Sequence, residues 1–274
     1  MFVLALVNQK GGCGKTTVAV NLAGALAELG HSTLLVDLDP QAHATMALGC
    51  APRAGVDATI FDVLAGEGSL DEAAQAASGG VWLVPSALEL AEFEELAARL
   101  IQPEGVLAER LEAARANFDF VILDCPPRAD GVLTANALRA CDCAVLVVET
   151  GAFALQGAIA AQRILLERHS QEEHVFGLRV LATMFDRRLR IAREILVALQ
   201  ARFGAALFDT TIRESVRLRE VAALGAPVQV IDPRSRSVED FRSLAAEVLA
   251  LAAGEDAQPS ELREHASAAD ARAR

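Results

Sequence analysis

The sequence predicts an α/β protein built on a doubly wound, mostly parallel β-sheet flanked by helices. Short, near-continuous apolar runs, typical of parallel strands buried on both faces, alternate with longer segments whose apolar residues recur at helical spacing. The chain has 274 residues, of which 53% are hydrophobic, with neither an internal repeat nor a Pro- or Ser-rich linker. We therefore expect one domain over residues 1–253, followed by a polar, non-periodic tail at 254–274.

The apolar runs and the segments between them define the expected elements in order. Strands are expected at residues 2–8, 33–37, 81–84, 120–124, 144–149, 179–183, 207–211 and 228–231. Helices, rich in Ala, Leu, Glu and Arg, are expected at residues 17–29, 88–100, 104–116, 154–168, 190–202 and 238–252. This alternation predicts crossover connections between parallel strands.

The charge is acidic overall but uneven along the chain. The formal net charge is -12, which argues against a surface coated for nucleic acid or anionic lipid. Residues 176–236 nevertheless carry eleven Arg against six Asp or Glu. This pattern is compatible with a locally basic face on an acidic body.

The sequence also predicts a cytoplasmic protein. No uninterrupted apolar run reaches the roughly 18 residues that span a bilayer. The apolar N-terminus has no basic segment before it and is followed by glycines rather than by a small-residue cleavage site, so we do not interpret it as a signal peptide. Five cysteines are an odd number for a disulfide framework, which fits a reducing compartment.

A glycine-rich segment lies between the first expected strand and the first expected helix. Residues 8–17 read Asn-Gln-Lys-Gly-Gly-Cys-Gly-Lys-Thr-Thr, a variant phosphate-binding loop in which Gln9 replaces the first glycine. Glycines let backbone N–H groups surround phosphates, and the helix N-terminus adds its positive dipole end. Lys15 is expected to reach the β- and γ-phosphates, and the Thr16 hydroxyl to bind Mg²⁺. The expected nucleotide-binding residues of the loop are Lys10, Gly11, Gly12, Cys13, Gly14, Lys15, Thr16 and Thr17.

Lysine is confined to this loop. Of the 25 basic residues, 23 are arginine, and the two lysines are Lys10 and Lys15. Arginine is a wide planar fork, whereas lysine is a compact charge on a slim stem. A narrow phosphate cradle lined by backbone accepts the second shape, so the composition favours a phosphate site here.

Residues 10–16 match in full the pattern Lys-Gly-Gly-x-Gly-Lys-Thr, and the chain resembles the deviant Walker-A ATPases of the ParA/MinD family. The resemblance extends to Leu-Leu-Val-Asp-Leu-Asp-Pro-Gln at 34–41 and to Phe-Val-Ile-Leu-Asp-Cys-Pro-Pro at 120–127. It covers about residues 1–250, and the first two motifs are similar to those of the ParA branch. The resemblance implies an ATPase of weak basal turnover that uses ATP and Mg²⁺.

The resemblance also implies roles for individual residues. Lys10 would be the signature lysine, reaching across a nucleotide-sandwich homodimer to the partner's phosphates. Asp39 would position the attacking water, so Lys10, Lys15 and Asp39 are the expected catalytic residues. Asp37 would support the magnesium shell and Asp124 would hold Mg²⁺ through water, beside Thr16. The alternative for Asp37 and Asp39 is a pair of capping carboxylates after a strand.

The chain departs from the family pattern in two places. Ala-His at 42–43 stands where the family often has Gly-Asn after Asp-Pro-Gln, so the switch segment is expected to move or sense differently. His43 is either a general base or a solvated loop residue. Arg213 stands where ParA proteins usually carry a proline after Ile212. By position, Met184, Phe185 and Arg213 are expected to border the adenine, although packing explains Met184 and Phe185 equally well.

The ParA branch commonly binds DNA without sequence preference as an ATP dimer. The resemblance therefore implies association with the nucleoid and a ParB-like adaptor that stimulates hydrolysis to segregate or position a chromosome, a plasmid or a protein complex. Sequence-independent phosphate binding needs only clustered cations, and solvated helix faces are the alternative explanation. The candidate DNA-binding residues are Arg187, Arg188, Arg190, Arg193, Arg217 and Arg219.

Three other functions remain as alternatives. A MinD-like protein would carry an amphipathic membrane helix at the C-terminus, whereas residues 255–274 contain one large apolar residue, Leu262, so membrane insertion is not expected. A reductase similar to the nitrogenase iron protein would need a thiolate pair for a cluster, but Cys141 and Cys143 are expected to point to opposite faces of a strand. A scaffold that only binds nucleotide would leave Asp39 idle.

Overall fold

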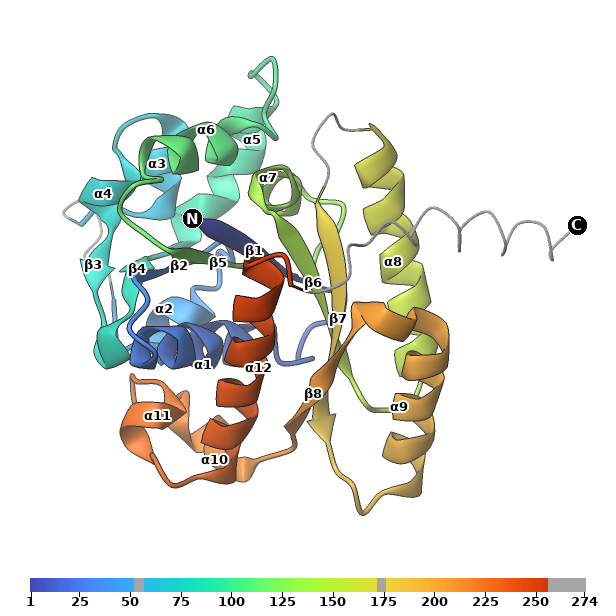
Figure 1. Ribbon diagram of the computed structural model, residues 1–274. Coiled ribbons are helices and arrows are strands. Elements are labelled where there is room, and N and C mark those ends of the chain that lie inside the picture. Colours follow the sequence, from blue (N-terminus) through green and yellow to red (C-terminus); the bar gives the residue numbers. More distant parts are fainter. Residues whose placement is uncertain (52–56, 172–175, 256–274) are drawn as a thin grey trace, which may run out of the picture.

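The computed structural model describes residues 1–51, 57–171 and 176–255, and it forms one eight-stranded sheet covered by helices on both faces (Figure 1). The strand order is β3-β4-β2-β5-β1-β6-β7-β8. Every neighbouring pair is parallel except β3 with β4. The predicted α/β class and mostly parallel sheet are confirmed, and the predicted tail lies, from residue 256 on, outside the described residues.

The strands are β1 (Phe2–Val7), β2 (Thr33–Asp37), β3 (Gln75–Ala76), β4 (Trp82–Val84), β5 (Phe120–Asp124), β6 (Cys143–Glu149), β7 (Gly177–Phe185) and β8 (Leu207–Arg213). The helices are α1 (Lys15–Glu28), α2 (His43–Ala47), α3 (Ile60–Ala65), α4 (Leu70–Ala73), α5 (Phe93–Ala97), α6 (Val106–Ala113), α7 (Val132–Ala140), α8 (Ala154–Gln171), α9 (Arg190–Phe203), α10 (Val216–Val221), α11 (Val228–Ile231) and α12 (Arg236–Ala252). Short 3₁₀ turns lie at η1 (Ser78–Gly80), η2 (Leu88–Glu92) and η3 (Gly204–Ala206).

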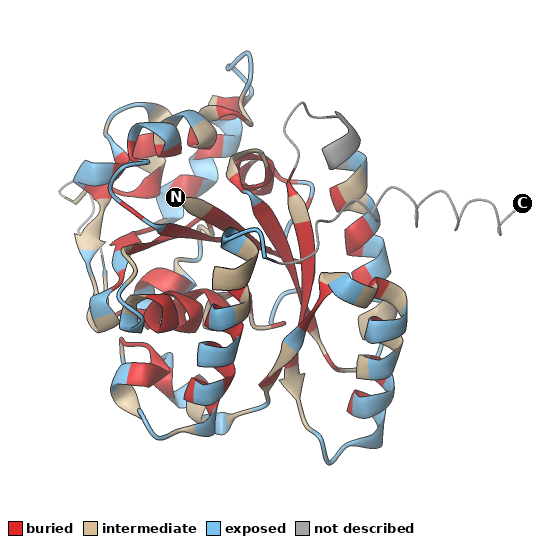
Figure 2. Cartoon of the chain, in the orientation of Figure 1, coloured by how far each residue is buried: buried red, intermediate tan, exposed pale blue. Residues whose placement is uncertain are grey.

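The alternation of side chains along the central strands builds two cores. On β1, Val3, Ala5 and Val7 pack with helices α3 to α9, whereas Leu4 and Leu6 pack with α1, α2, α10, α11 and α12. Because successive strand residues point to opposite faces, a strand apolar at every position fills both cores. Figure 2 shows the result, a buried sheet between helices that are exposed only on their outer sides.

One predicted strand is wrong. Residues 228–231 form helix α11 rather than a strand, since Pro227 O accepts the N–H groups of Val230 and Ile231 at 3.0 and 3.2 Å. The N–H of Val228 donates to Asn21 Oδ1 on α1 at 2.7 Å. A four-residue segment with three apolar residues, Val-Gln-Val-Ile, does not distinguish a strand from one helical turn, and here contact with α1 selects the turn.

The helix expected at residues 88–100 is also divided. Its first part is the 3₁₀ turn η2, and α5 continues from Phe93 to Ala97. Helix α7, which the sequence reading did not include, covers β1 and β5 on one face, with Leu133, Ala137 and Leu138 buried. Its sequence contains Thr and Asn between apolar residues, and this weakens the helical pattern.

The two edges of the sheet are short or irregular. Edge strand β3 has two residues and runs antiparallel to β4. At the other edge, the pairing of β8 with β7 shifts register twice, between Val180 and Ala182 and between Ala182 and Phe185. In the described ranges, no helix is long and apolar enough to cross a lipid bilayer.

Candidate functional site

The loop at residues 8–14 lies at the carboxyl end of β1, near the middle of the sheet. Loops from the same ends of β2, β5 and β7 meet it, as expected for a ligand site in an open parallel sheet. Together they surround a cavity of about 770 Å³. Its lining includes Gly11, Gly12, Gly14, Lys15, Thr16, Thr17, Asp39, Gln41, His43, Pro127 and Met184.

The glycines of the loop hold a backbone that other residues rarely adopt. Gly12 and Gly14 have φ of 75° and 95°, in the left-handed region that favours glycine. Gly14 directly precedes α1, so the free N–H groups of the first turn of α1 point at the loop. The Thr183 hydroxyl on β7 donates to Cys13 O at 2.7 Å, which fixes the loop against the sheet.

Both lysines are held by the protein itself in this structure. Lys15 is 7% exposed, and its ammonium donates to the carbonyl oxygens of Asn8 and Lys10, both at 3.3 Å. Lys10 is far more accessible, with a side chain 58% exposed, and its ammonium forms an ion pair with Glu149 at the end of β6. A phosphate entering the loop offers Lys15 a charged acceptor in place of two neutral carbonyl groups.

Thr16 and Asp124 form the geometry expected of a magnesium site. The Thr16 hydroxyl donates to Asp124 Oδ2 at 2.7 Å. The other oxygen, Asp124 Oδ1, is buried and has no hydrogen-bond partner. Burial, and secondarily the nearby Asp37 carboxyl, raises the pKa of Asp124 to about 8. An orphaned carboxylate oxygen beside a threonine hydroxyl suits a hard, oxygen-seeking cation, so these residues fit Mg²⁺.

Asp37 uses both carboxylate oxygens to hold the chain that follows β2. Its Oδ2 accepts from the backbone N–H of Thr45 at 2.8 Å and from the Thr45 hydroxyl at 2.7 Å, and its Oδ1 accepts from Asp39 N at 3.1 Å. Burial raises the pKa of Asp37 to about 6, despite these hydrogen bonds. The geometry therefore makes Asp37 an anchor for α2 and for the backbone of Asp39, while its expected support of the magnesium shell stays a prediction.

The segment between Asp39 and α2 is strained. Ala42 has φ of 55°, in the left-handed region where an Ala Cβ is disfavoured. Asp39 accepts Gln41 N at 2.9 Å and, with the exposed His43, lines the cavity. Non-glycine residues at positive φ cluster at functional sites, and the expectation that this segment moves or senses differently stays a prediction.

The cavity continues into an apolar wall that the sequence reading missed. Met184, at φ of 52°, lies opposite α10 and the turn after it. This mostly apolar wall suits a nucleotide base. Its position was hidden in the sequence because it depends on where α10 and the turn after it lie relative to β7. The wall residues beyond Met184 are Val20, Leu218, Arg219, Val221, Ala222, Ala223 and Ala226.

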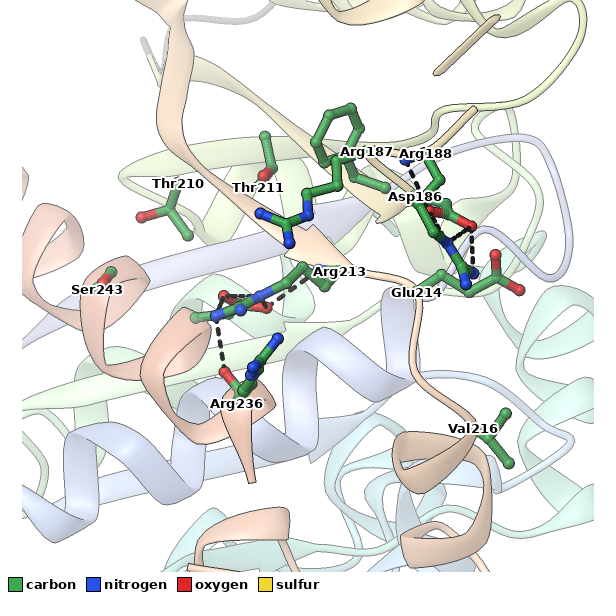
Figure 3. Close-up of a pocket in the computed structure, with 12 residues that line it drawn as sticks. Asp186, Arg187, Arg188, Thr210, Thr211, Arg213, Glu214, Val216, Arg236 and Ser243 are labelled. Atoms are coloured by element: carbon green, nitrogen blue, oxygen red, sulfur yellow. Dashed lines mark hydrogen bonds and ion pairs between the residues drawn. The ribbon is translucent and has the colours of Figure 1, made fainter. Parts of the chain in front are cut away.

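Arg213 borders a small hollow beside Gly14 and Met184. Its guanidinium is held by α12, because its Nε donates to both carboxylate oxygens of Asp240, at 2.8 and 3.0 Å. Its Nη2 donates to Arg236 O at 3.0 Å (Figure 3). The expected place of Arg213 at the border of the adenine therefore stays a prediction.

A second hollow, of about 760 Å³, lies between the ends of β7 and β8 and the start of α12. The side chains of Arg187 and Arg236 extend toward that of Arg213 within it (Figure 3). Arg188 also lines it, but its guanidinium is paired with Asp186 at 2.7 Å. This pairing lowers the pKa of Asp186 to about 2. The hollow thus gathers several cations from elements far apart in the sequence.

The six arginines expected to bind DNA fall into two groups. Four have a carboxylate partner: Arg188 with Asp186, Arg190 with Glu194, Arg217 with Asp232 and Glu220, and Arg219 with Glu214. Arg187 and Arg193 have no ion-pair partner among the described residues. Arg219 lies on the wall of the nucleotide cavity rather than in the second hollow. The cluster is therefore less basic than a count of arginines suggests.

Among the described residues, no group of three or more His, Cys, Asp or Glu is placed to hold a metal ion. Cys141 follows α7 and is not on a strand, which corrects the expectation, whereas Cys143 begins β6. The two residues still belong to opposite cores. Burial raises the pKa of Cys143 to about 12, so this thiol stays protonated at neutral pH.

Two residues of the site were missed by sequence reasoning and emerge from sheet register. Asn8 Nδ2 donates to Val147 O at 2.6 Å, and Glu149 binds Lys10. Neither follows from a motif, because β1 and β6 are separated by more than a hundred residues. The sequence predicts both strands but does not specify that they are neighbours in the sheet.

The strand, glycine loop and helix, with Lys15, Thr16 and a carboxylate at the end of the neighbouring strand, define a P-loop nucleoside triphosphatase. Residues 1–173 match the family described as AAA domain. The chain is 36% identical over 252 residues to the sporulation initiation inhibitor protein Soj of Bacillus subtilis, which covers 90% of this chain and 98% of Soj. It is 35% identical over 251 residues to the chromosome partitioning protein ParA of Caulobacter vibrioides, which covers 90% and 93%.

Among solved structures, cobyrinic acid a,c-diamide synthase from Mycobacterium smegmatis, with bound ADP and magnesium, has a TM-score of 0.80. It is 28% identical in sequence, with 91% of this chain and 94% of that chain covered. The chain therefore belongs to the ParA/MinD family of P-loop ATPases, with Soj and ParA as relatives. The family expected from the sequence is confirmed.

Proposed function

We propose that this chain is a ParA-like partitioning ATPase in which ATP joins two copies face to face. The observation that carries the proposal is the pair of lysines in one loop, one buried and one exposed. Lys15 is buried in the loop and lines the cavity for its own subunit's phosphates, whereas Lys10 is exposed on the loop and free to reach a partner's nucleotide. Hydrolysis that needs Lys10 from the other subunit depends on dimerisation.

Within one subunit, the loop amides and Lys15 bind the phosphates, and the base lies against Met184 and α10. Thr16 and Asp124 hold Mg²⁺, which neutralises charge on the phosphate oxygens when bound. Asp39 orients the attacking water, because it lines the cavity and its carboxylate is held only by Gln41 N among the described residues. Asp37 keeps Asp39 in place through α2. Phosphoryl transfer needs this positioning more than it needs covalent chemistry.

The ATP dimer binds DNA without sequence preference. The second hollow supports this step, because Arg187 and Arg236 extend into it without a carboxylate partner among the described residues. Two copies double the number of such cations, and the affinity should fall steeply with salt. The acidic net charge of -12 limits binding to this local face.

The dimer associates with the nucleoid in the cytoplasm, and a ParB-like adaptor stimulates hydrolysis and release. The cargo that it segregates or positions is a chromosome, a plasmid or a protein complex. Relatives named for chromosome partitioning support this role. A membrane-bound, MinD-like cycle is the alternative, and no residue described in the structure favours it over DNA.

The test is sedimentation velocity with a non-hydrolysable ATP analogue and Mg²⁺. We expect wild type to form a dimer and Lys10→Ala to remain monomeric, while Asp39→Ala dimerises but does not turn over ATP. Duplex DNA and anionic liposomes are then offered separately to the ATP form. Binding to DNA that is lost in Arg187→Glu/Arg236→Glu supports the proposal. A wild type that stays monomeric would refute it, and flotation with liposomes without DNA binding would favour the MinD-like cycle.

A further inference from the structure

The ion pair between Lys10 and Glu149 has no place in nucleotide binding by a single subunit. Glu149 lies outside the three motifs that carry the resemblance, at the end of β6. Its side chain is 30% exposed, and its partner Lys10 is the exposed lysine of the loop. The carboxylate faces the loop, because its Oε2 accepts from the ammonium of Lys10. An anion in this position competes with phosphate for Lys10.

Sheet register brings the two residues together. Strands β1 and β6 pair in parallel, with Leu4 opposite Cys143 and Val7 opposite Leu146. Lys10 is three residues beyond Val7, and Glu149 is three beyond Leu146, so the register of β1 and β6 places both residues at the same end of the sheet. The pairing of two central strands therefore brings Glu149 within reach of Lys10.

The backbone of Lys10 is fixed by other contacts, so its side chain alone is free to move. Lys10 N donates to Asn8 Oδ1 at 3.1 Å, and Asn8 is itself tied to β6. Lys10 O accepts from the ammonium of Lys15 and from Cys13 Sγ, both at 3.3 Å. When a phosphate draws Lys15 away from this carbonyl, the loop loses one of the contacts that hold Lys10 in its present position.

We propose that Glu149 is a positioning residue for Lys10, which holds its ammonium within its own subunit until a partner's triphosphate competes for it. The inference rests on the proposed function, in which Lys10 acts across the dimer. In the separate subunit, Glu149 balances the charge of Lys10 and keeps it from an empty site. In the dimer, the triphosphate carries more negative charge than one carboxylate and takes the ammonium.

The expected effect of removing Glu149 on dimerisation follows from the exposure of its ion pair with Lys10. A partly exposed ion pair biases an equilibrium by up to about fivefold, because water and salt screen it. Two such pairs open when a symmetric dimer forms, so removing Glu149 should tighten ATP-dependent dimerisation by up to about 25-fold. The gain should shrink as salt rises, since salt already weakens the pair in wild type.

The first measurement is the dimer dissociation constant with a non-hydrolysable ATP analogue. Glu149→Gln keeps the shape of the side chain and removes its charge, and Glu149→Ala is the second variant. Glu28→Gln is the matched control, because Glu28 forms a similarly exposed pair with Arg242 at the far end of α1. We expect tighter dimers and higher activity at low protein concentration for the Glu149 variants, but wild-type behaviour for Glu28→Gln.

The second measurement uses the scarcity of lysine. Lys10 and Lys15 are the two lysines of the chain, so mass spectrometry after brief acylation of the nucleotide-free protein reports on each. An amine released from its ion pair should react faster, so Lys10 acylation should rise severalfold in Glu149→Gln, with Lys15 as the internal reference. This readout does not require a dimer, and a merely structural role of Glu149 would not move it selectively.

The outcomes separate the two proposals. A wild type that does not dimerise with ATP analogue overturns the role of Lys10 across the dimer. Equal Lys10 acylation in wild type and Glu149→Gln overturns the ion pair as a restraint. A wild-type dimer together with unchanged or weaker dimerisation of both Glu149 variants overturns the positioning role alone.

Discussion

The buried carboxyl pair Asp37 and Asp124 predicts that magnesium binding releases a proton. Burial raises the pKa of Asp124 to about 8 and that of Asp37 to about 6, and the two groups also repel each other's charge. At pH 7 the pair therefore shares about one proton. Because Mg²⁺ requires the ionised carboxylate of Asp124, its affinity should rise with pH by up to about tenfold per unit between about pH 6 and 8, and then level off.

The assay is calorimetry of Mg²⁺ binding to the nucleotide complex in two buffers of different ionisation enthalpy. We expect wild type to release about one proton more on binding Mg²⁺ at pH 7 than the free nucleotide releases in the same buffers, and the difference to vanish near pH 9. Mg²⁺ titration of the free nucleotide accounts for the protons that come from the nucleotide. A wild-type complex that releases no more protons than the free nucleotide, or a wild-type affinity that is flat between pH 6 and 8, would refute the reasoning.

The same carboxyl pair determines the direction in which the stability of the fold changes with pH. The folded protein holds this proton more tightly than the unfolded chain, in which an aspartate has a pKa of about 3.9. The stability of the ligand-free protein should therefore be greatest near or below that value, as far as this pair is concerned, and fall as pH rises toward 8. In Asp124→Asn, urea unfolding should lose most of this slope.

Three further substitutions test the packing around the site. Ala42→Gly should raise the free energy of unfolding by about 0.5–1 kcal/mol in urea, because relief of positive φ outweighs the added freedom of the unfolded chain, and no gain would mean that Ala42 is not strained. Gly24→Ala should lower it by about 1–3 kcal/mol, since the new Cβ would lie 2.7 Å from Pro227 Cβ, and an unchanged urea midpoint would contradict this contact. Thr45→Val should lower the free energy of unfolding by about 1–3 kcal/mol and reduce kcat, because it leaves a buried Asp37 oxygen with one hydrogen-bond donor fewer. An unchanged kcat would exclude α2 from positioning Asp39.

The sequence predicted the parts of the fold that local pattern determines. Strand β5 and strand β2 were predicted to the residue, because each is an apolar run that ends at an aspartate. The loop between β1 and α1 was predicted because its glycines let the backbone N–H groups surround a phosphate. The strand predicted at residues 228–231 was wrong, since the conformation of this segment depends on a contact with α1 near the other end of the chain.

The residues of the site also fall into those that short motifs identify and those that distant contacts place. Lys15, Thr16 and Asp124 were identified from motifs, and the structure brings the last two within hydrogen-bond distance. Arg213 was given a place near adenine, but Asp240 on α12 determines where its charge lies. Glu149 was missed because it meets Lys10 through the register of two strands, which no short motif encodes.

The edges of the sheet limit how copies of this molecule can join. A two-residue strand at one side and a twice-shifted pairing at the other offer no long, regular row of amide groups to a neighbour. Continuation of the sheet into a second molecule, the usual beginning of fibrils, is thus discouraged at both ends. If the chain gathers on DNA and is released again, as proposed above, the lack of such an irreversible alternative favours that cycle.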